Sequence, residues 1–108
     1  MFALFVMLLA SITACSPQAP LSPTEVLVKR GRQVYQTNCA ACHNADPKLK
    51  GSLGPDVWGS SKELLTARIV HGNYPAGYTP KKAGGGMPAL PHLKNEIDAL
   101  YEYLNAQP

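Results

Sequence analysis

Hydrophobic and polar positions first follow a helical period after residue 21. Residues Ser22–Glu25 are typical of a helix start, because a serine cap, a proline in the first turn and a glutamate three residues later form a capping box. The helix is predicted to run to about Asn38, and its expected buried face carries Leu27, Gly31, Val34 or Tyr35, and Asn38. Glycine costs about 1 kcal/mol relative to alanine inside a helix, so we expect another backbone to pass close to Gly31.

Two further helices are predicted nearer the C-terminus. Ser60 and Glu63 repeat the capping pattern, and Gly72 supplies a left-handed stop. The apolar residues between them are Leu64, Leu65, Ala67, Ile69 and Val70. Asn95 is expected to cap a third helix, whose apolar stripe is Leu93, Ile97, Leu100 or Tyr101, and Leu104. No stretch alternates as a strand would, so the pattern predicts an all-α fold with about three main helices.

The segments between these helices are long and rich in glycine and proline. They are residues 51–55 and Gly72–Pro91. Long loops without secondary structure are usually functional or disordered. A prosthetic group enclosed by the loops is the functional alternative, and it would also fill the core of a domain that is marginally small.

The N-terminal residues are predicted to direct the chain rather than to fold with it. Residues 2–10 are continuously apolar, and the stretch of roughly 13 apolar or small residues is shorter than the ~20 that a membrane-spanning helix needs. Residues 12–15, Ile-Thr-Ala-Cys, resemble the bacterial lipoprotein box, in which cleavage leaves the cysteine as a lipid-modified N-terminus. The alternative is an uncleaved short anchor helix with an inert Cys15, and the basic residues expected before a signal are missing.

This pattern predicts three parts of the chain. Residues 1–14 are a signal peptide, residues 15–23 are a lipidated Cys15 with a proline-rich linker, and residues 24–108 are one domain. We expect the domain on the periplasmic side, held at the membrane by the N-terminal lipid, with a soluble periplasmic protein as the alternative. All ten Lys and Arg and all seven Asp and Glu lie beyond residue 24, and a net charge of +3 does not favour a nucleic-acid partner.

Residues 39–43, Cys-Ala-Ala-Cys-His, are the strongest chemical signal in the chain. Two thiols at this spacing can each add to a vinyl group of one porphyrin, and the adjacent histidine can then bind its iron. A redox dithiol and half of a zinc site are the alternatives, but the first favours a βαβ setting and the second needs another ligand cluster. His71 and His92 stand singly. We therefore expect one covalent haem c on Cys39 and Cys42, with its iron held by His43.

With this motif, residues 24–108 resemble a class I cytochrome c domain. Gly31 and Tyr35 resemble the contact positions of the first helix of that family, and Leu100 with Tyr103 resemble their partners on the last helix. The resemblance implies a cytochrome c-like fold, with long loops wrapped around one covalently bound haem.

Residues 54–59, Gly-Pro-Asp-Val-Trp-Gly, resemble the Gly-Pro-x-Leu-x-Gly loop of the same family, with Val57 where leucine is commoner. The resemblance implies that the Pro55 carbonyl accepts a hydrogen bond from His43, which would orient the imidazole. A plain turn is the alternative, and Trp58 receives no role.

Met87 is the expected second axial ligand, because the other methionines lie in the predicted signal. It follows three glycines that let the backbone approach a porphyrin, and Pro88 stiffens the other side. The ligand of the resembling family also lies in a Met-Pro loop. A lone methionine is more often core filler, and ligation by His71 or His92 or an open iron site are the alternatives.

Sulfur opposite histidine raises the potential of the iron and leaves no vacant position for oxygen chemistry. We therefore predict an electron carrier and not an enzyme. Its expected partners are redox proteins: a dehydrogenase, a quinol-oxidising complex or a terminal oxidase. The alternatives are a small enzyme or gas sensor with a vacant iron, and a fixed subunit of a larger redox complex. Lys81 and Lys82 precede the Met87 loop, either as part of a docking surface or as solvated side chains.

Overall fold

The computed structural model describes residues 11–83 and 86–107, and in these residues all regular structure is helical. The elements in chain order are α1 Pro23–Asn38, α2 Ala40–His43, α3 Lys62–Leu65, the π-helix η1 Thr66–His71, the 3-10 helix η2 Pro91–Glu96, and α4 Ile97–Leu104. The predicted all-α fold is confirmed. Residues 1–10 of the expected signal, Gly84 and Gly85 of the Met87 loop, and Pro108 lie outside the described residues.

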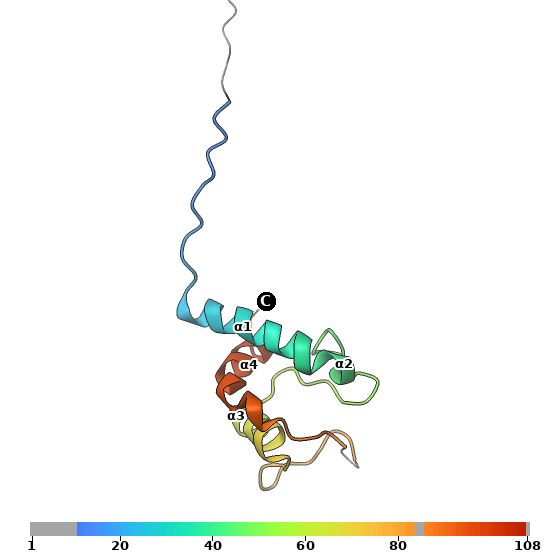
Figure 1. Ribbon diagram of the computed structural model, residues 1–108. Coiled ribbons are helices and arrows are strands. Elements are labelled where there is room, and N and C mark those ends of the chain that lie inside the picture. Colours follow the sequence, from blue (N-terminus) through green and yellow to red (C-terminus); the bar gives the residue numbers. More distant parts are fainter. Residues whose placement is uncertain (1–10, 84–85, 108) are drawn as a thin grey trace, which may run out of the picture.

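Helix α1 begins and ends where the sequence pattern predicts. The Ser22 hydroxyl accepts from the Glu25 backbone N–H at 3.2 Å, and the Glu25 carboxylate accepts from the Ser22 N–H at 2.7 Å, which completes the capping box. The chain before it, residues 11–22, is extended and runs away from the helices (Figure 1). No helix in the described part of the chain is long and apolar enough to cross a membrane.

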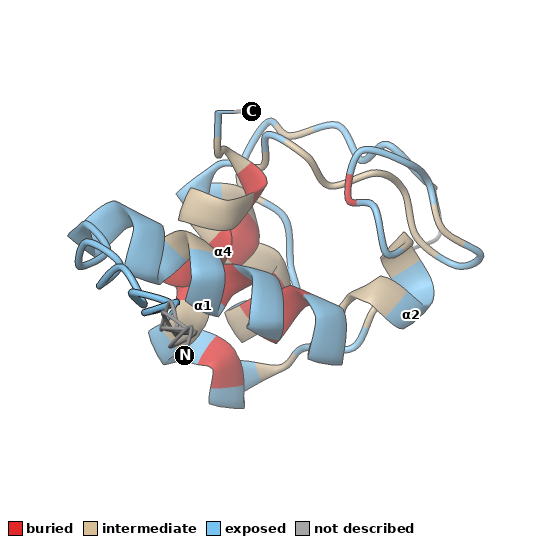
Figure 2. Ribbon diagram, turned by 90° about the horizontal axis from the view of Figure 1, so that it is seen from above, coloured by how far each residue is buried: buried red, intermediate tan, exposed pale blue. Residues whose placement is uncertain are grey.

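The core lies where α1 and α4 face one another (Figure 2). Its buried apolar side chains are Val34, Tyr35, Leu65, Ile69, Leu93, Ile97, Ala99, Leu100 and Leu104. The stripe predicted for α1 is wrong at its two ends, since Leu27 and Asn38 are exposed. Leu27 lies one turn before the crossing with α4, and Asn38 turns its amide back to the Val34 carbonyl at 2.9 Å.

Gly31 is the point at which the two helices touch. A Cβ atom at this position would overlap the Ala99 carbonyl oxygen and would lie 2.8 Å from the Cβ of Tyr103. Beside this contact the rings of Tyr35 and Tyr103 meet with their centroids 5.6 Å apart. The expected close approach of another backbone to Gly31 is therefore confirmed, and the partner is α4.

The second predicted helix begins one residue later than expected. Ser61, not Ser60, caps α3 by accepting from the Leu64 N–H at 3.1 Å. The Ser60 hydroxyl is unavailable as a cap, because it donates to the Val57 carbonyl at 2.6 Å and closes the preceding turn. After α3 the helix widens into η1, and it ends at Gly72 in the predicted left-handed conformation, with φ of 69°.

The third helical region begins before the predicted cap. Asn95 lies inside η2 and caps nothing, because the chain already turns at Pro91, whose ring favours a helical start. The turn η2 buries Leu93 and leads directly into α4. His92 accordingly lies in the first turn of η2 and not in a loop.

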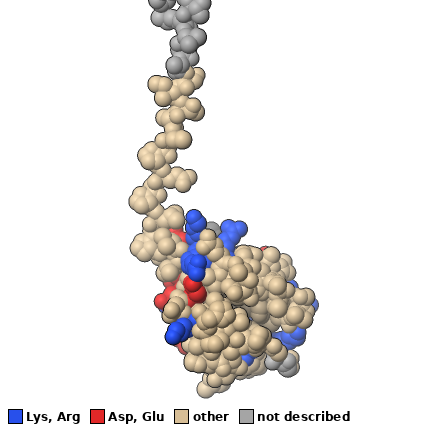
Figure 3. Space-filling model, viewed as in Figure 1, with Lys and Arg blue, Asp and Glu red and all other residues tan. Residues whose placement is uncertain are grey.

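Charged side chains are scattered over the surface. On the face seen in Figure 3, Lys and Arg side chains adjoin Asp and Glu side chains near α1, and most of the face carries no charge. Three ion pairs lie among the described residues, namely Arg30 with Glu96, Lys62 with Asp98, and Lys81 with Asp56. Exposed pairs of this kind contribute little to stability, because solvent and salt screen their charges, so the core carries most of the stability.

Replacing Gly31 with alanine is expected to lower the free energy of unfolding by about 2 kcal/mol, measured by urea denaturation followed by circular dichroism. The added methyl group would collide with a backbone carbonyl that cannot rotate away, and overpacking outweighs the roughly 1 kcal/mol gained in helix propensity. Gln33→Ala, on the exposed side of the same helix, is the control and should change stability by less than about 0.5 kcal/mol. Equal stability of Gly31→Ala and wild type would contradict the close crossing.

Candidate cofactor site

A cavity of about 710 Å³ lies between the helices and the two long loops. This volume is within the range of about 300–1,000 Å³ that is usual for cofactor sites. Its wall includes all five cofactor residues predicted from the sequence, namely Cys39, Cys42, His43, Pro55 and Met87. Residues from α1, α3, η1 and α4 complete the wall, so the cavity is enclosed by segments far apart in the sequence.

The segment with the two cysteines forms a short helix of its own, α2, which the sequence pattern did not predict. The carbonyl of Cys39 accepts from the N–H groups of Cys42 at 3.2 Å and His43 at 3.0 Å. This single turn brings both thiols and the imidazole to one wall of the cavity. The chain leaves the turn at Asn44 with φ of 79° and ψ of 146°, a positive-φ conformation that residues other than glycine seldom adopt.

Tyr35 connects this turn to the helical core. Its side chain is 1% exposed, and its hydroxyl donates to the Asn44 carbonyl at 2.7 Å. The N–H of Cys39 also donates to the Tyr35 carbonyl, at 2.8 Å, so the turn continues directly from the last residues of α1. The position of the cysteine pair therefore depends on the packing of α1 against α4.

The following loop is folded back on the same turn. The Cys42 carbonyl accepts from the N–H groups of Leu53 at 3.2 Å and Gly54 at 2.9 Å. A Cβ atom at Gly51 would lie 2.7 Å from the Asn44 nitrogen, so the loop needs a glycine there to approach so closely. These contacts place Pro55 opposite the imidazole of His43.

His43 is held in one orientation. Its Nδ1 lies 2.8 Å from the Pro55 carbonyl oxygen, and because a carbonyl can only accept, Nδ1 carries the proton. The neutral ring then has its free lone pair on Nε2, which is the form that binds a metal. A Cβ atom at Gly54 would lie 2.6 Å from Nδ1, so the glycine leaves the space that the ring occupies.

The environment of Cys39 does not resemble that of a reactive redox dithiol. Burial, together with the nearby Cys42, raises the pKa of Cys39 to about 11. Reactive dithiols have an attacking cysteine with a lowered pKa, usually in a βαβ fold. No strand and no cluster of three or more His, Cys, Asp or Glu suited to a metal ion occurs in residues 11–83 and 86–107.

The opposite part of the cavity is formed by η1 and the loop that follows it. Met87 is half-buried and packs against the apolar core. Arg68, Tyr74 and Tyr78 also line the cavity here. Sequence reasoning missed Arg68, because an arginine in an apolar helix gives no signal until the loop that it contacts is placed.

The two alternative histidine ligands lie elsewhere. His71 and His92 are both exposed, and neither is among the residues that line the cavity. Cys15 is exposed in the extended N-terminal segment, also outside the cavity.

Lys81 and Lys82 join the two long loops. The Lys81 ammonium lies 2.7 Å from the Asp56 carboxylate, and its hydrogen bond lowers the pKa of that carboxyl group. Lys82 donates to the Leu53 carbonyl. These lysines therefore fasten the segment before Met87 to the loop that holds His43, a role that the sequence pattern did not predict.

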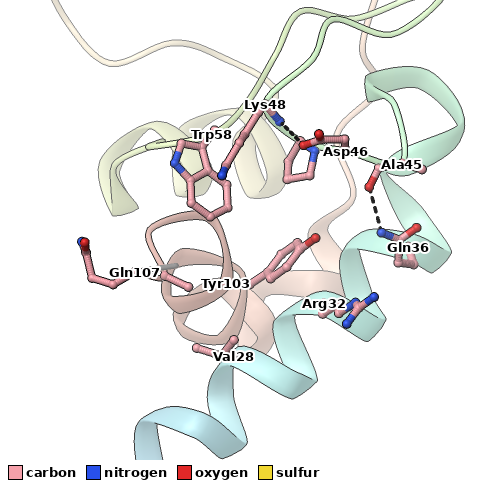
Figure 4. Close-up of a pocket in the computed structure, with 11 residues that line it drawn as sticks. Val28, Arg32, Gln36, Ala45, Asp46, Lys48, Trp58, Tyr103 and Gln107 are labelled. Carbon is pink, nitrogen blue, oxygen red and sulfur yellow. Dashed lines mark hydrogen bonds between the residues drawn. The ribbon is translucent and has the colours of Figure 1, made fainter.

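A second, smaller cavity of about 410 Å³ lies between α1, the C-terminal residues and the loop at 45–48 (Figure 4). Trp58 lines both cavities, and the Lys48 ammonium lies 4.6 Å from the centre of its ring. No cysteine, histidine or methionine lines the smaller cavity. The residues predicted to attach and ligate a haem therefore line the larger cavity.

Comparison with known proteins decides the family. Residues 26–104 match the family described as cytochrome c oxidase, cbb3-type, subunit III. The chain belongs to this family of c-type cytochrome domains. This membership confirms the prediction of a class I, electron-transfer haem protein. It also confirms the prediction that the protein carries electrons and is not an enzyme.

Curated relatives agree with this assignment. A cytochrome c-553-like protein of Synechocystis is 35% identical over 75 residues, which cover 69% of this chain and 64% of that protein. The cbb3-type cytochrome c oxidase subunit FixP of Sinorhizobium medicae is 35% identical over 88 residues, covering 74% of this chain and 26% of FixP. The cytochrome bc1 complex cytochrome c subunit of Mycobacterium leprae is 24% identical over 100 residues, which cover 91% of this chain and 34% of that subunit. The chain spans less than two thirds of the length of each of these relatives.

The wild-type cytochrome is expected to lose stability at alkaline pH through Tyr35, and the Tyr35→Phe variant should lack this loss. Burial above all, with the nearby Cys39, raises the pKa of Tyr35 from 10.0 to about 12. The unfolded phenol therefore ionises first, and the stabilisation from keeping Tyr35 neutral is lost as the pH rises from about 10 to about 12. Urea denaturation across this range should show the stability difference between wild type and variant shrinking. A constant difference would show that the phenol titrates alike in both states.

Proposed function

We propose that this cytochrome carries one haem c, bonded to Cys39 and Cys42 and ligated by His43 and Met87, and that it transfers single electrons between redox proteins. One observation carries the proposal: both thiols, the oriented imidazole and the thioether line the same cavity. The bound haem would supply the one-electron couple of its iron. The protein residues attach it, hold its axial ligands and exclude water.

The chemistry of the donor set fits a haem better than a metal ion alone. The cavity lining is mainly apolar, as a porphyrin face requires, and its volume of about 710 Å³ suits a large planar group. Cys39 directly precedes α2 and Cys42 lies in it, and both line the cavity together with His43, which supports attachment beside the proximal ligand. One attachment motif in the sequence supports a single haem.

His43 would serve as the proximal ligand. The proton on Nδ1 is committed to the Pro55 carbonyl at 2.8 Å, so Nε2 is free to bind iron. Such a hydrogen bond fixes the ring and raises the basicity of the ligand, which favours the oxidised metal. The Gly54 and Gly51 contacts keep Pro55 in place and so support this geometry.

Met87 would serve as the second axial ligand. It lines the cavity, whereas His71 and His92 are exposed and do not. A thioether is a weak, neutral ligand that favours the reduced iron and leaves no vacant position for oxygen or peroxide. This arrangement supports an electron carrier in preference to a gas sensor or a small peroxidase.

Redox complexes are the partners that we propose. One relative is named as a subunit of a cbb3-type cytochrome c oxidase and another as a cytochrome c subunit of the bc1 complex. These names support exchange of electrons with a terminal oxidase, a quinol-oxidising complex or a dehydrogenase, either as a mobile carrier or as a fixed subunit.

We further propose that the domain works on the periplasmic side, tethered to the membrane by a lipid on Cys15. In this proposal residues 1–14 are removed, residues 15–23 form the linker and residues 24–108 form the haem domain. The exposed Cys15 and the extended, proline-rich chain up to α1 support an extended spacer between the lipid and the domain.

Met87→Ala should open the iron, while haem attachment persists because Cys39 and Cys42 are unchanged. The ferrous variant should bind carbon monoxide at once, the far-red sulfur-to-iron absorption band should disappear, and its haem should remain on a denaturing gel. Met87→His should lower the reduction potential, since axial ligand identity is one of the factors that spread haem potentials over about 0.8 V.

The matched controls are His71→Ala and His92→Ala, which should leave the band and the potential unchanged. A haem that is extracted by acidified organic solvent would contradict covalent attachment. A native protein without the far-red band, together with a Met87→Ala variant of unaltered spectrum, would contradict Met87 ligation.

Cys15→Ser should prevent acylation of the protein, read from its intact mass, without changing its haem spectrum. The residue lies outside the cavity, so only the tether should be affected. Intact mass spectrometry of the wild-type protein should show an acylated Cys15 as the first residue. A mature mass that retains residues 1–14, or an unacylated Cys15, would contradict lipidation.

A further inference from the structure

Arg68 contacts the loop of Met87 in three ways. Its guanidinium donates to the Gly72 carbonyl at 3.0 Å and to the Met87 carbonyl at 3.4 Å. Its carbon Cζ lies 4.3 Å from the centre of the Tyr74 ring, within the range of a cation–π contact. One side chain therefore joins η1, the turn at Gly72 and the backbone of the proposed ligand.

The tyrosines limit where Arg68 can lie. Tyr74 and Tyr78 are stacked, with ring centroids 5.5 Å apart and an angle of 11° between their planes. Arg68 packs on Tyr74, and all three side chains line the large cavity. The guanidinium is planar and presents several donors in a fixed arrangement, so it can stack on a ring and bond to two carbonyls together. A lysine ammonium lacks this shape.

The π-helix η1 makes a further contact with the same loop. The Ile69 carbonyl accepts from the Leu90 N–H at 2.6 Å, while the Ile69 side chain is buried in the core. A Cβ atom at Gly72 would lie 3.3 Å from the Cβ of Ala89, so the loop passes directly over the end of η1. Single π turns occur often at functional sites. Two residues of η1 therefore hold the loop: Arg68 bonds to the carbonyl of Met87, and Ile69 bonds to the N–H of Leu90.

We propose that Arg68 is a positioning residue for Met87, which keeps the thioether directed into the cavity in both oxidation states. The inference rests on the proposed Met87 ligation. A thioether binds iron weakly, so small backbone movements of its loop suffice to break the bond. Arg68 opposes these movements from a rigid helix whose own side chains are anchored in the core.

Arg68→Ala tests this inference in the full-length haem protein. The variant should keep its haem on a denaturing gel and its helical circular dichroism, since Arg68 is not part of the buried core. Its far-red sulfur-to-iron band should weaken, its reduction potential should fall, and carbon monoxide should bind to the ferrous form about tenfold faster, because the fraction with a vacant iron is larger. Arg68→Lys should lie between the variant and wild type.

Arg32→Ala is the matched control, because Arg32 is an exposed arginine on α1 that does not line the haem cavity. It should leave the band, the potential and the carbon monoxide rate unchanged. Tyr74→Leu removes the ring on which the guanidinium packs, so it should reproduce part of the Arg68→Ala effect. If Arg68→Ala does not accumulate, the same three measurements on Tyr74→Leu test the role of Arg68.

The outcomes separate the inference from the proposed function. A wild-type protein with the far-red band, and an Arg68→Ala variant whose band, potential and carbon monoxide rate match it, would overturn the role of Arg68 alone. A wild-type protein that lacks the band would overturn Met87 ligation, and the inference with it. Equal effects of Arg32→Ala and Arg68→Ala would show a general charge effect and would also overturn the inference.

Discussion

The crossing of α1 and α4 at Gly31 is the contact on which the rest of the structure depends. Because a glycine lets the Ala99 backbone approach, Tyr35 becomes buried against Tyr103 and Leu100. Tyr35 in turn holds the chain after α1 through the Asn44 carbonyl and the Cys39 N–H. The turn at residues 39–43 is therefore an extension of the core, and a shift of its two cysteines would disturb the contacts of Tyr35.

From this turn, backbone contacts of the following loop continue the cavity wall, which residues of α3, η1 and α4 complete. The Cys42 carbonyl receives two N–H groups of the next loop, and that loop presents the Pro55 carbonyl to His43. Lys81 and Lys82 then connect the same loop to the segment that precedes Met87. The loop that holds His43 and the segment before Met87 are thus connected directly. Such ties explain how loops of this length keep one shape in so small a domain.

The two sides of the cavity are held by different means. The His43 side depends on short hydrogen bonds between neighbouring stretches of backbone, which leave little freedom for the ring. The Met87 side depends on Arg68, on the stacked tyrosines and on the π-helix η1. The ring of His43 is thus held through its own side chain, whereas Met87 is held through its backbone carbonyl and through the packing of its loop.

Local patterns in the sequence determined much of this arrangement. The capping box at Ser22, the left-handed stop at Gly72 and the apolar stripe of α4 act between residues close in the chain, and the structure shows all three. The cysteine motif was recognisable because its chemistry restricts it to few roles. Pro55 was expected from the resemblance of its loop to the cytochrome c family, and Met87 because the other methionines lie in the predicted signal; all of these residues line one cavity.

The sequence-based predictions were wrong or missing where a side chain or backbone group bonds to a segment outside its own helix. Ser60 was expected to cap a helix, but its hydroxyl serves the turn at Val57, and Asn95 lies inside a helical turn that Pro91 had already begun. The widening into η1, the ion pair of Lys81 with Asp56 and the contacts of Arg68 depend on loops far away in the chain. Sequence alone therefore predicted the helical class and the residues that line the cavity, since caps, apolar stripes and short motifs act over short distances in the chain. Only the tertiary structure decided which side chains connect the loops around the cavity, because those partners meet only after folding.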